Sequence, residues 1–280
     1  MSTILKLGGE LLEDAGAVRS AAEAIVRLAA TAPLVVVHGG GRAIDAELRA
    51  RGESPRFVDG LRITDQAALD TVVSVLAGRT NTTLVAAIGA AGGRAVGLTG
   101  ADGRIGLSRR AASLRTVSGE LADLGLVGEP EGTDASLLTD LVRIGCIPVV
   151  ASIGVDPDGV LLNVNADVLA AHLAAIMPAR RLIVAGGTAG VLDADGRTVP
   201  ELRVDAIDAM MASGVAHSGM VAKLGACRLA FASGVTDISI VAGRGAVDFT
   251  SAPGTRIVAR LRPSGSGAAG KEMKQVETRG

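Results

Sequence analysis

Short apolar runs alternate along the chain with Gly-rich turns and with segments of helical periodicity. Thr3–Leu7 is such a run, and apolar residues then recur at helical spacing from Val18 to Ala29. Leu34–Val37 is a continuous apolar run between Pro33 and a glycine triplet, which is typical of a central strand covered on both faces. The same patterns predict strands at 147–150, 182–185 and 238–241, and helices at about 42–51, 69–88, 134–145, 166–177, 203–213 and 219–233.

These elements predict the fold class. Strands that alternate with helices indicate an α/β protein with a mainly parallel central sheet sandwiched between helices. The stretch 100–130 is richer in Gly, Ser and charge, which indicates a β-hairpin excursion outside the central sheet. The segment 264–280 is rich in Gly, Ser, Lys and Glu and has little to bury, so we expect a disordered tail.

Composition narrows the function classes. Of the 280 residues, 48% are apolar and 20% are charged, and the formal net charge is -1. This balance predicts binding neither to nucleic acid nor to an anionic membrane. No apolar run approaches a membrane span, and the N-terminus lacks the pattern of an export signal, so we expect a cytoplasmic protein. Cys146 and Cys227 have no His or Cys at metal spacing, which indicates reduced structural thiols.

Two Gly-rich loops follow the first two predicted strands. They are Lys6–Gly9 and His38–Gly41, and both fall beyond the carboxyl ends of strands, where parallel α/β sheets bind ligands. Glycine lets the backbone approach an anion closely, and the N-terminus of a following helix adds its amides. Neither loop has the P-loop sequence, and each alone could be a tight strand-to-helix turn. Together they favour an anion-binding site.

Three further motifs carry polar groups. Arg62, within Phe57–Thr64, could be a solvated surface charge or a forked donor for a substrate carboxylate. Leu162–Asp167 places three short polar groups at alternate positions at a predicted helix start, which is more than helix capping needs. Gly219–Lys223 lies at the start of another predicted helix, and a lone lysine there would normally have a solvated side chain.

In this order the five motifs resemble the amino acid kinase family, over roughly residues 3 to 258. The ordered set is far more specific than any single motif. Phe57–Thr64 and Asn163–Asp167 favour the branch that uses ATP to phosphorylate the side-chain carboxylate of N-acetyl-L-glutamate in arginine biosynthesis. The resemblance implies a single domain over 1–263, with an acceptor and dimerisation lobe over about 1–178 and a nucleotide lobe over about 179–263.

The resemblance also implies a role for each site residue. Lys6 and Lys223 would place positive charge on the transferring phosphoryl group, and Asp167 would hold both ammonium groups. Mg²⁺ would bridge the β- and γ-phosphates of ATP, with no metal site made of protein groups alone. The nucleophile would be a carboxylate that is ionised at neutral pH, so no general base is required. Phosphoryl oxygens and the reacting carboxylate would be received by the amides around Gly8, Gly9, Gly40 and Gly41. The acceptor would be bound by Arg62, Asn163 and Asn165. The nucleotide would be enclosed by Gly187, Gly190, Val191, Leu192, Val215 and His217.

Departures from the family pattern concern the nucleotide side and the N-terminus. Gly186–Gly187 stands where the family usually carries a Ser/Thr–Asp pair, and Ser218 stands where Asp commonly precedes Gly-Met. Both changes remove carboxylates, which affects nucleotide affinity and metal handling. Only two residues precede the first strand, where arginine-inhibited members carry an extra helix. We therefore expect a homodimer that is insensitive to arginine.

Other functions fit parts of the pattern. A kinase for an aminoadipate or glutamate group carried by a protein would need an open, basic mouth, for which Arg104, Arg109 and Arg110 are candidates. A solvated hairpin explains these arginines equally simply. A non-catalytic module that binds an amino acid or nucleotide would not need both lysines and Asp167. A Rossmann-type oxidoreductase is disfavoured, because the Gly-x-Gly-x-x-Gly context is missing after the first strand.

Overall fold

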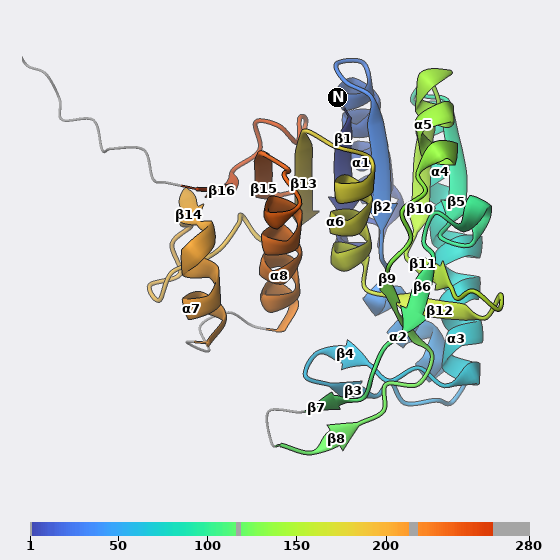
Figure 1. Cartoon of the computed structure of the whole chain (residues 1–280). Coiled ribbons are helices and arrows are strands. Elements are labelled where there is room, and N and C mark those ends of the chain that lie inside the picture. The colour runs from blue at the N-terminus through green and yellow to red at the C-terminus, as the bar shows by residue number, and fades with distance from the viewer. Residues whose placement is uncertain (1, 116–118, 213–217, 260–280) are drawn as a thin grey trace, which may run out of the picture.

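An eight-stranded sheet runs through the molecule (Figure 1). The computed structural model describes residues 2–115, 119–212 and 218–259. In spatial order the strands are β14 (Glu201–Arg203), β16 (Gly254–Val258), β15 (Asp237–Ala242), β13 (Arg181–Gly186), β1 (Thr3–Leu7), β2 (Leu34–His38), β10 (Ile147–Ala151) and β5 (Ala95–Thr99). Neighbouring strands are parallel except β15 with β16, so the prediction of a mainly parallel sheet is confirmed.

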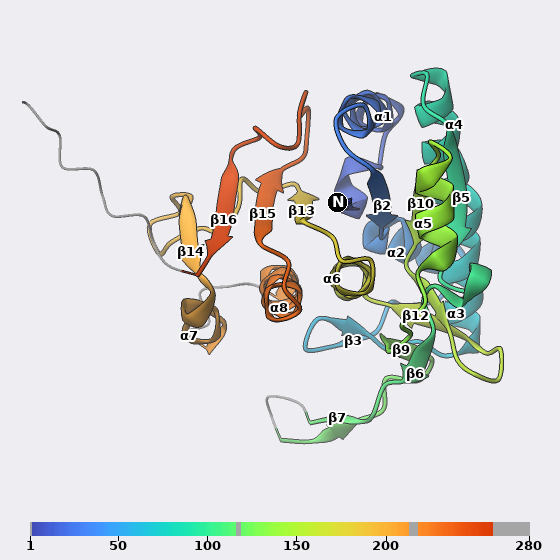
Figure 2. The ribbon, with the colours of Figure 1, turned by 45° about the horizontal axis from the view of Figure 1, so that its top comes forward.

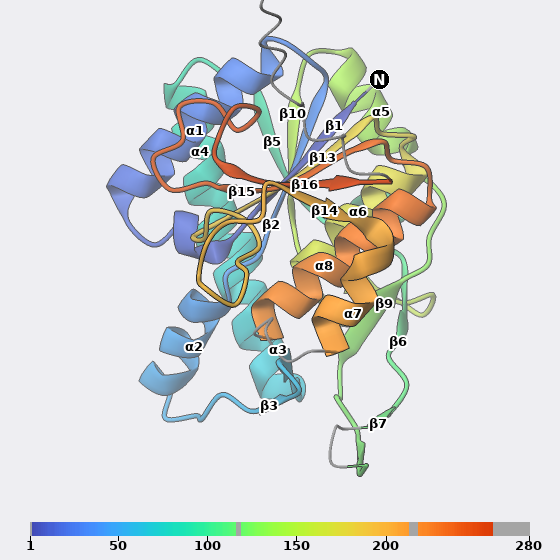
Figure 3. The ribbon, with the colours of Figure 1, turned by 90° about the vertical axis from the view of Figure 1, so that its left-hand side faces the viewer.

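Helices cover both faces of this sheet (Figure 2, Figure 3). One face carries α1 (Ala15–Ala29) and α4 (Thr82–Ala90), and the other carries α5 (Ser136–Arg143), α6 (Ala166–Ile176) and α8 (Ser218–Ala232). Ile4 and Val35 point into the core under α6 and α8, whereas Leu5 and Val36 point into the core under α1 and α4. Because both faces are buried, the central strands are apolar throughout rather than at alternate positions.

The predicted long helix is confirmed and runs without a break from Gln66 to Ala90. It consists of α3 (Gln66–Val73), a π-helical segment (Ser74–Asn81) and α4. Among the described residues, it is the helix whose length and composition would suffice to cross a membrane. It packs against β5, β10 and α1, and 33% of its most apolar stretch is buried within the described structure.

A second, smaller sheet lies beyond the carboxyl ends of β2 and β10 (Figure 1). Its strands, in spatial order, are β11 (Ile153–Val155), β12 (Leu161–Val164), β9 (Val127–Pro130) and β6 (Ser108–Arg110). Two hairpins extend below it, β3 (Phe57–Val58) with β4 (Leu61–Arg62), and β7 (Leu114–Arg115) with β8 (Leu121–Ala122). The prediction that 100–130 leaves the central sheet is confirmed for its described residues.

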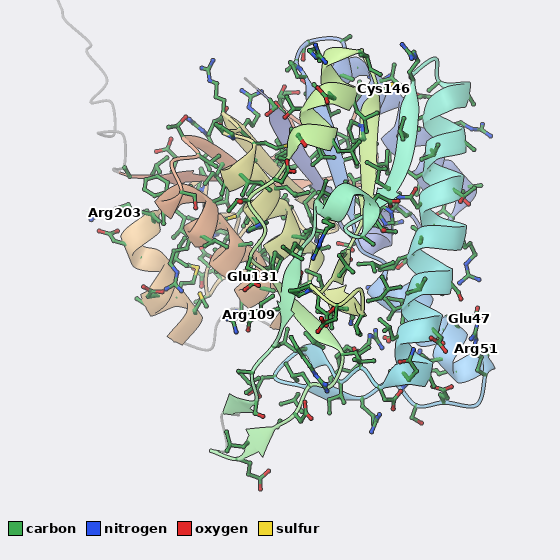
Figure 4. All side chains as sticks on the ribbon, turned by 45° about the vertical axis from the view of Figure 1, so that its right-hand side comes forward. Glu47, Arg51, Arg109, Glu131, Cys146 and Arg203 are labelled. Carbon is green, nitrogen blue, oxygen red and sulfur yellow. The ribbon has the colours of Figure 1, made fainter. Side chains whose placement is uncertain are left out.

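Some elements differ from the sequence prediction. The helix expected at 203–213 begins later, because 201–203 forms β14 and the α-helix is α7 (Ile207–Ala212). The strands β5, β11, β12, β14 and β16 were not expected. The division into two lobes stays a prediction, and the expected tail over 264–280 lies outside the described residues. Both cysteines are free and buried, and Cys146 lies just before β10 (Figure 4).

The register of three central strands places three loops side by side. Leu7 at the end of β1 pairs with Ala185 of β13 on one side and with His38 of β2 on the other. The chain therefore leaves all three strands at the same edge of the sheet. The helix α2 (Gly41–Ala50) begins at this edge, directly after the glycine triplet.

Candidate active site

The two Gly-rich loops touch each other at the carboxyl ends of β1 and β2. A Cβ added to Gly9 would lie 2.8 Å from Cα of Gly40, so a side chain at this position would push the loops apart. The amide of Gly8 donates to the carbonyl of Ala185 at 2.8 Å, which fixes the first loop against β13. The hypothesis that these loops act together is therefore supported by their contact.

A buried ion pair lies at the end of β1. Nζ of Lys6 is 2.9 Å from Oδ1 of Asp167, the second residue of α6, and both side chains are more than 90% buried. Oδ1 of Asn165 caps α6 by accepting the amides of Asp167 and Val168 at 2.9 and 3.2 Å. This cap fixes the first turn of the helix and with it the carboxylate that faces Lys6. Capping therefore explains one of the alternating polar residues, as the sequence allowed.

Lys223 reaches the same region from α8 without contacting Asp167. Its Nζ lies over Gly186 at the end of β13, 2.8 Å from the position that a Cβ would occupy. Among the described residues it forms no ion pair, so the structure brings Lys6 but not Lys223 into ion-pair distance of Asp167. Gly219 and Lys223 line two different cavities, and these cavities therefore meet at the lysine.

The first cavity, of about 420 Å³, is lined by both Gly-rich loops and by the β3–β4 hairpin. In it, Nη2 of Arg62 donates to Oδ1 of Asp45 at 2.6 Å and to the carbonyl of Gly41 at 3.3 Å. The guanidinium also lies over the ring of Phe57, 4.7 Å from its centre. Nη1 of Arg62 is buried without a hydrogen-bond partner. A buried guanidinium with one unmatched nitrogen suits a ligand carboxylate.

A polar side chain from β12 also lines this cavity. The amide nitrogen of Asn163 donates to the hydroxyl of Thr64 at 3.0 Å. That hydroxyl also lies within hydrogen-bond distance of the carbonyl of Arg62, at 3.3 Å. The side chain of Asn163 is thereby held in place beside the hairpin that carries the arginine. The predicted acceptor residues Gly40, Gly41, Arg62, Asn163 and Asn165 all line this one cavity.

The second cavity, of about 600 Å³, is lined by residues between Thr188 and Lys223. Its walls come from the loop after β13, from α7 and from the start of α8, and most of the groups that line it are apolar. Gly190 has a φ of +94°, and a Cβ there would lie 2.5 Å from the hydroxyl of Thr255. The same hydroxyl accepts the amide of Val191 at 2.8 Å, so β16 holds this loop. Of the predicted nucleotide residues, Gly190, Val191, Leu192 and Lys223 line the cavity. Gly8 and Gly187 lie against Glu10, which lines the first cavity, and Val215 and His217 fall outside the described residues.

A buried polar network supports the second Gly-rich loop. Nδ1 of His38 lies 3.2 Å from the carbonyl of Gly39, and because a carbonyl only accepts, Nδ1 carries the proton. Nε2 then accepts from the amide nitrogen of Asn81, 3.0 Å away, which also donates to the carbonyl of Val149. Burial lowers the pKa of His38 to about 4, although the Gly39 hydrogen bond opposes this. These contacts give His38 a structural role.

The arginines proposed as a basic mouth have partners within the protein. Arg109 forms ion pairs with Glu129 and Glu131, and Figure 4 shows its side chain close to Glu131. Arg104 donates to the carbonyl of Pro157 at 3.3 Å, and Arg110 donates to that of Gly125 at 2.8 Å. Their charges support the second sheet and its loops, so they give no support to a carrier-protein substrate.

Four residues of the site region escaped the sequence analysis. Asp45 acts through Arg62, and Asn81 acts through His38; each pair is distant in sequence. Thr255, in the last strand, holds the loop at Gly190. No local pattern marks these contacts. Glu10 did leave a signal, because a charged residue directly follows a glycine pair at the end of a buried strand. Among the described residues, no three His, Cys, Asp or Glu side chains form a group that could hold a metal ion.

Comparison with known proteins gives the same assignment as the motifs. The model of the amino acid kinase family matches residues 1–242. Acetylglutamate kinase of Zymomonas mobilis is 41% identical over 246 residues, 86% of this chain and 82% of that protein. The acetylglutamate kinase of Methanoculleus marisnigri is 39% identical over 249 residues, 86% of this chain and 85% of that protein.

Solved structures share the fold at low sequence identity. N-acetylglutamate synthase from Neisseria gonorrhoeae superposes with a TM-score of 0.79 at 22% identity, covering 96% of this chain and 62% of that chain. Giardia carbamate kinase gives a TM-score of 0.62 at 17% identity over 92% of this chain and 99% of that chain. With a family match over most of its length, and relatives at about 40% identity, the chain belongs to the amino acid kinase family.

Proposed function

We propose that this protein is an ATP-dependent kinase that phosphorylates the side-chain carboxylate of N-acetyl-L-glutamate, giving N-acetyl-L-glutamyl 5-phosphate in arginine biosynthesis. The relatives named acetylglutamate kinase support this activity. The observation that carries the proposal is the position of Lys223, which lines both the first and the second cavity. A lysine at this junction can face a phosphoryl group that passes from one cavity to the other.

Positive charge and backbone amides would stabilise the transferring phosphoryl group. Lys6 lies on β1, Lys223 reaches the end of β13 from α8, and Asp167 orients Lys6 by the 2.9 Å ion pair. Gly8, Gly9, Gly40 and Gly41 keep the backbone of both loops open to an incoming anion. Phosphoryl transfer depends mainly on such positioning and charge neutralisation.

The first cavity, at Arg62, would hold the acceptor. Arg62 has a buried, unpartnered Nη1 for the α-carboxylate, and Asn163 and Asn165 add polar groups to the lining of the same cavity. The reacting side-chain carboxylate is already ionised at neutral pH, so no proton has to be removed. His38, at the end of the neighbouring strand β2, is kept neutral at pH 7 by burial and so adds no charge near Lys6.

The second cavity would hold the adenosine of ATP, against Gly190, Val191 and Leu192, with Gly187 at the phosphates. Mg²⁺ fits a site of this composition, since it binds through one or two carboxylates together with phosphate oxygens. Glu10 supplies a carboxylate next to Lys6 and Lys223. Bound Mg²⁺ would neutralise part of the charge of the β- and γ-phosphates.

We also propose a cytoplasmic homodimer. The substrates ATP and a free amino-acid derivative are cytoplasmic metabolites. The helix Gln66–Ala90 supports a dimer, because only 33% of its most apolar stretch is buried within the chain. Light scattering of the purified protein tests the oligomeric state, and a monomeric mass would contradict this part of the proposal.

An acyl phosphate product provides a specific test. Hydroxylamine added to a reaction of Mg-ATP with N-acetylglutamate would convert the product into a hydroxamate, which iron(III) reveals by its colour. We expect hydroxamate and ADP in equal amounts with N-acetylglutamate. ADP formed without hydroxamate would indicate simple ATP hydrolysis and would count against the proposed reaction.

A further inference from the structure

Three glycines surround the carboxylate of Glu10 at the ends of β1 and β13. Oε1 of Glu10 accepts the amide of Gly187 at 2.8 Å. A Cβ added to Gly8 would lie 2.5 Å from both carboxylate oxygens, and one added to Gly186 would lie 3.2 Å from Oε1. We call Gly8, Gly186 and Gly187 the glycine cradle. A side chain at Gly8 would displace this carboxylate and one at Gly186 would crowd it, so the cradle leaves room for a carboxylate from the first loop.

Positive charge surrounds the glycine cradle. Burial by itself raises the pKa of Glu10, but the amides of Glu10 and Gly187 and the charges of Lys6 and Lys223 lower it below its ordinary value. Glu10 is therefore an anion at neutral pH. It forms no direct ion pair with either lysine among the described contacts, and Lys6 is paired with Asp167. Two lysines and two carboxylates thus balance each other in this part of the site.

The carboxylate of Glu10 affects how a nucleotide can bind. Under the proposed function, phosphate groups approach the ends of β1 and β13, where the carboxylate of Glu10 lies. Bare phosphates bring several negative charges close to it in a partly desolvated site, where charges interact more strongly than in water. A divalent cation on the phosphates reverses this interaction, because it is attracted to the carboxylate.

We propose that Glu10 is a specificity-determining residue that makes the site select the nucleotide complexed with a divalent cation over the free nucleotide. The inference rests on the proposed nucleotide-dependent function. Its physical basis is the placement of one carboxylate inside the glycine cradle, close to Lys223 over Gly186 and within the electrostatic influence of Lys6, where the lysines would otherwise attract any polyphosphate.

Calorimetric titration with ADP tests the inference without turnover. Wild type, Glu10→Gln, Glu10→Asp and Glu23→Gln are each titrated with excess Mg²⁺ and again with EDTA. Glu23 on α1 is exposed and away from the cavities, so its variant makes the same change of net charge elsewhere. We expect Glu10→Gln to reduce the preference for Mg-ADP about ten-fold or more, chiefly because metal-free ADP binds more tightly.

The controls separate charge from shape and from the proposed function. Glu10→Asp keeps the charge and should retain more of the preference than Glu10→Gln, whereas Glu23→Gln should match wild type. An unchanged preference in Glu10→Gln, or equal losses with Asp and Gln, would overturn the inference and leave the proposed function standing. Wild type that binds ADP under neither condition would overturn both.

Discussion

Nη2 of Arg62 donates to Oδ1 of Asp45 at 2.6 Å, while Nη1 of the same guanidinium is buried without a partner. The ring of Phe57, 4.7 Å away, adds a second constraint on the plane of the guanidinium. The arginine is therefore held in one orientation before any ligand arrives. A preformed donor of this kind is typical of sites that recognise a carboxylate.

Replacing Arg62 by Lys should weaken acceptor binding. A lysine cannot bind Asp45 and a ligand carboxylate with two coplanar donors. We expect the KM for N-acetylglutamate to rise about ten-fold to a hundred-fold, with a smaller change in kcat, since a charged hydrogen bond contributes about 1.5–3 kcal/mol. Arg56→Lys is a matched control, because Arg56 is exposed and pairs with Asp65 outside the cavity. A wild-type KM in Arg62→Lys would contradict the acceptor site.

Lys223→Ala should remove turnover while preserving the fold. The side chain makes no ion pair among the described residues, so its loss breaks no direct ion pair. We expect kcat to fall about a hundred-fold or more, because a charge that stabilises the transferring group is lost. Steady-state kinetics and circular dichroism check both parts. A well-folded variant with a near-wild-type rate would exclude the proposed role.

Lys6→Ala should affect stability as well as turnover. Its removal leaves the buried carboxylate of Asp167 without a partner, which costs about 3–5 kcal/mol in comparable pairs. Adding Asp167→Asn should restore much of the free energy of unfolding in urea but not the rate. Recovery of turnover in the double variant would show that Lys6 acts only through the ion pair.

The central strands and the meeting of the Gly-rich loops could be predicted from sequence. Leu34–Val37 forms β2, and Leu182–Ala185 lies within β13, because uninterrupted apolar runs mark strands buried on both faces. Once those strands are parallel neighbours of β1, their following loops must share one edge. The resemblance implied that Asp167 holds both lysines, and among the described residues the structure pairs it with Lys6 but not with Lys223.

Other features depended on contacts that sequence does not encode locally. β5 contains Gly97 and is only partly buried at the edge of the sheet, so it lacks the apolar run of a central strand. The π-helical segment before Asn81 has no pattern of its own. Asp45 looks like any polar helix residue until the β3–β4 hairpin brings Arg62 against it.

His38 should make stability depend on pH. Its pKa is about 4 in the folded protein and about 6.5 when unfolded, so the unfolded state binds more protons between these values. The free energy of unfolding is therefore highest above pH 6.5 and falls as pH drops towards 4. We expect wild type to lose about 2–3 kcal/mol more than His38→Gln between about pH 7.5 and about pH 4.5 in urea unfolding. Parallel losses in the two proteins would contradict the buried neutral histidine.

Gly9→Ala should separate the two Gly-rich loops. The added methyl group would lie 2.8 Å from Cα of Gly40, and backbone cannot move aside as a flexible side chain can. We expect a loss of about 1–3 kcal/mol in the free energy of unfolding, together with reduced turnover. Gly89→Ala in α4 has no atom within 4 Å of its added Cβ and should stabilise the helix by about 0.5–1 kcal/mol. Equal stabilities of the two variants would contradict the contact between the loops.

The most direct measurement is ADP production from Mg-ATP with a panel of acceptors. Parallel reactions contain N-acetylglutamate, glutamate, aspartate, N-acetylaminoadipate, carbamate, UMP or no acceptor. We predict turnover with N-acetylglutamate alone, and its loss in Lys223→Ala. No turnover with any acceptor, from protein that still binds N-acetylglutamate, would contradict the proposed kinase activity and would indicate a binding module instead.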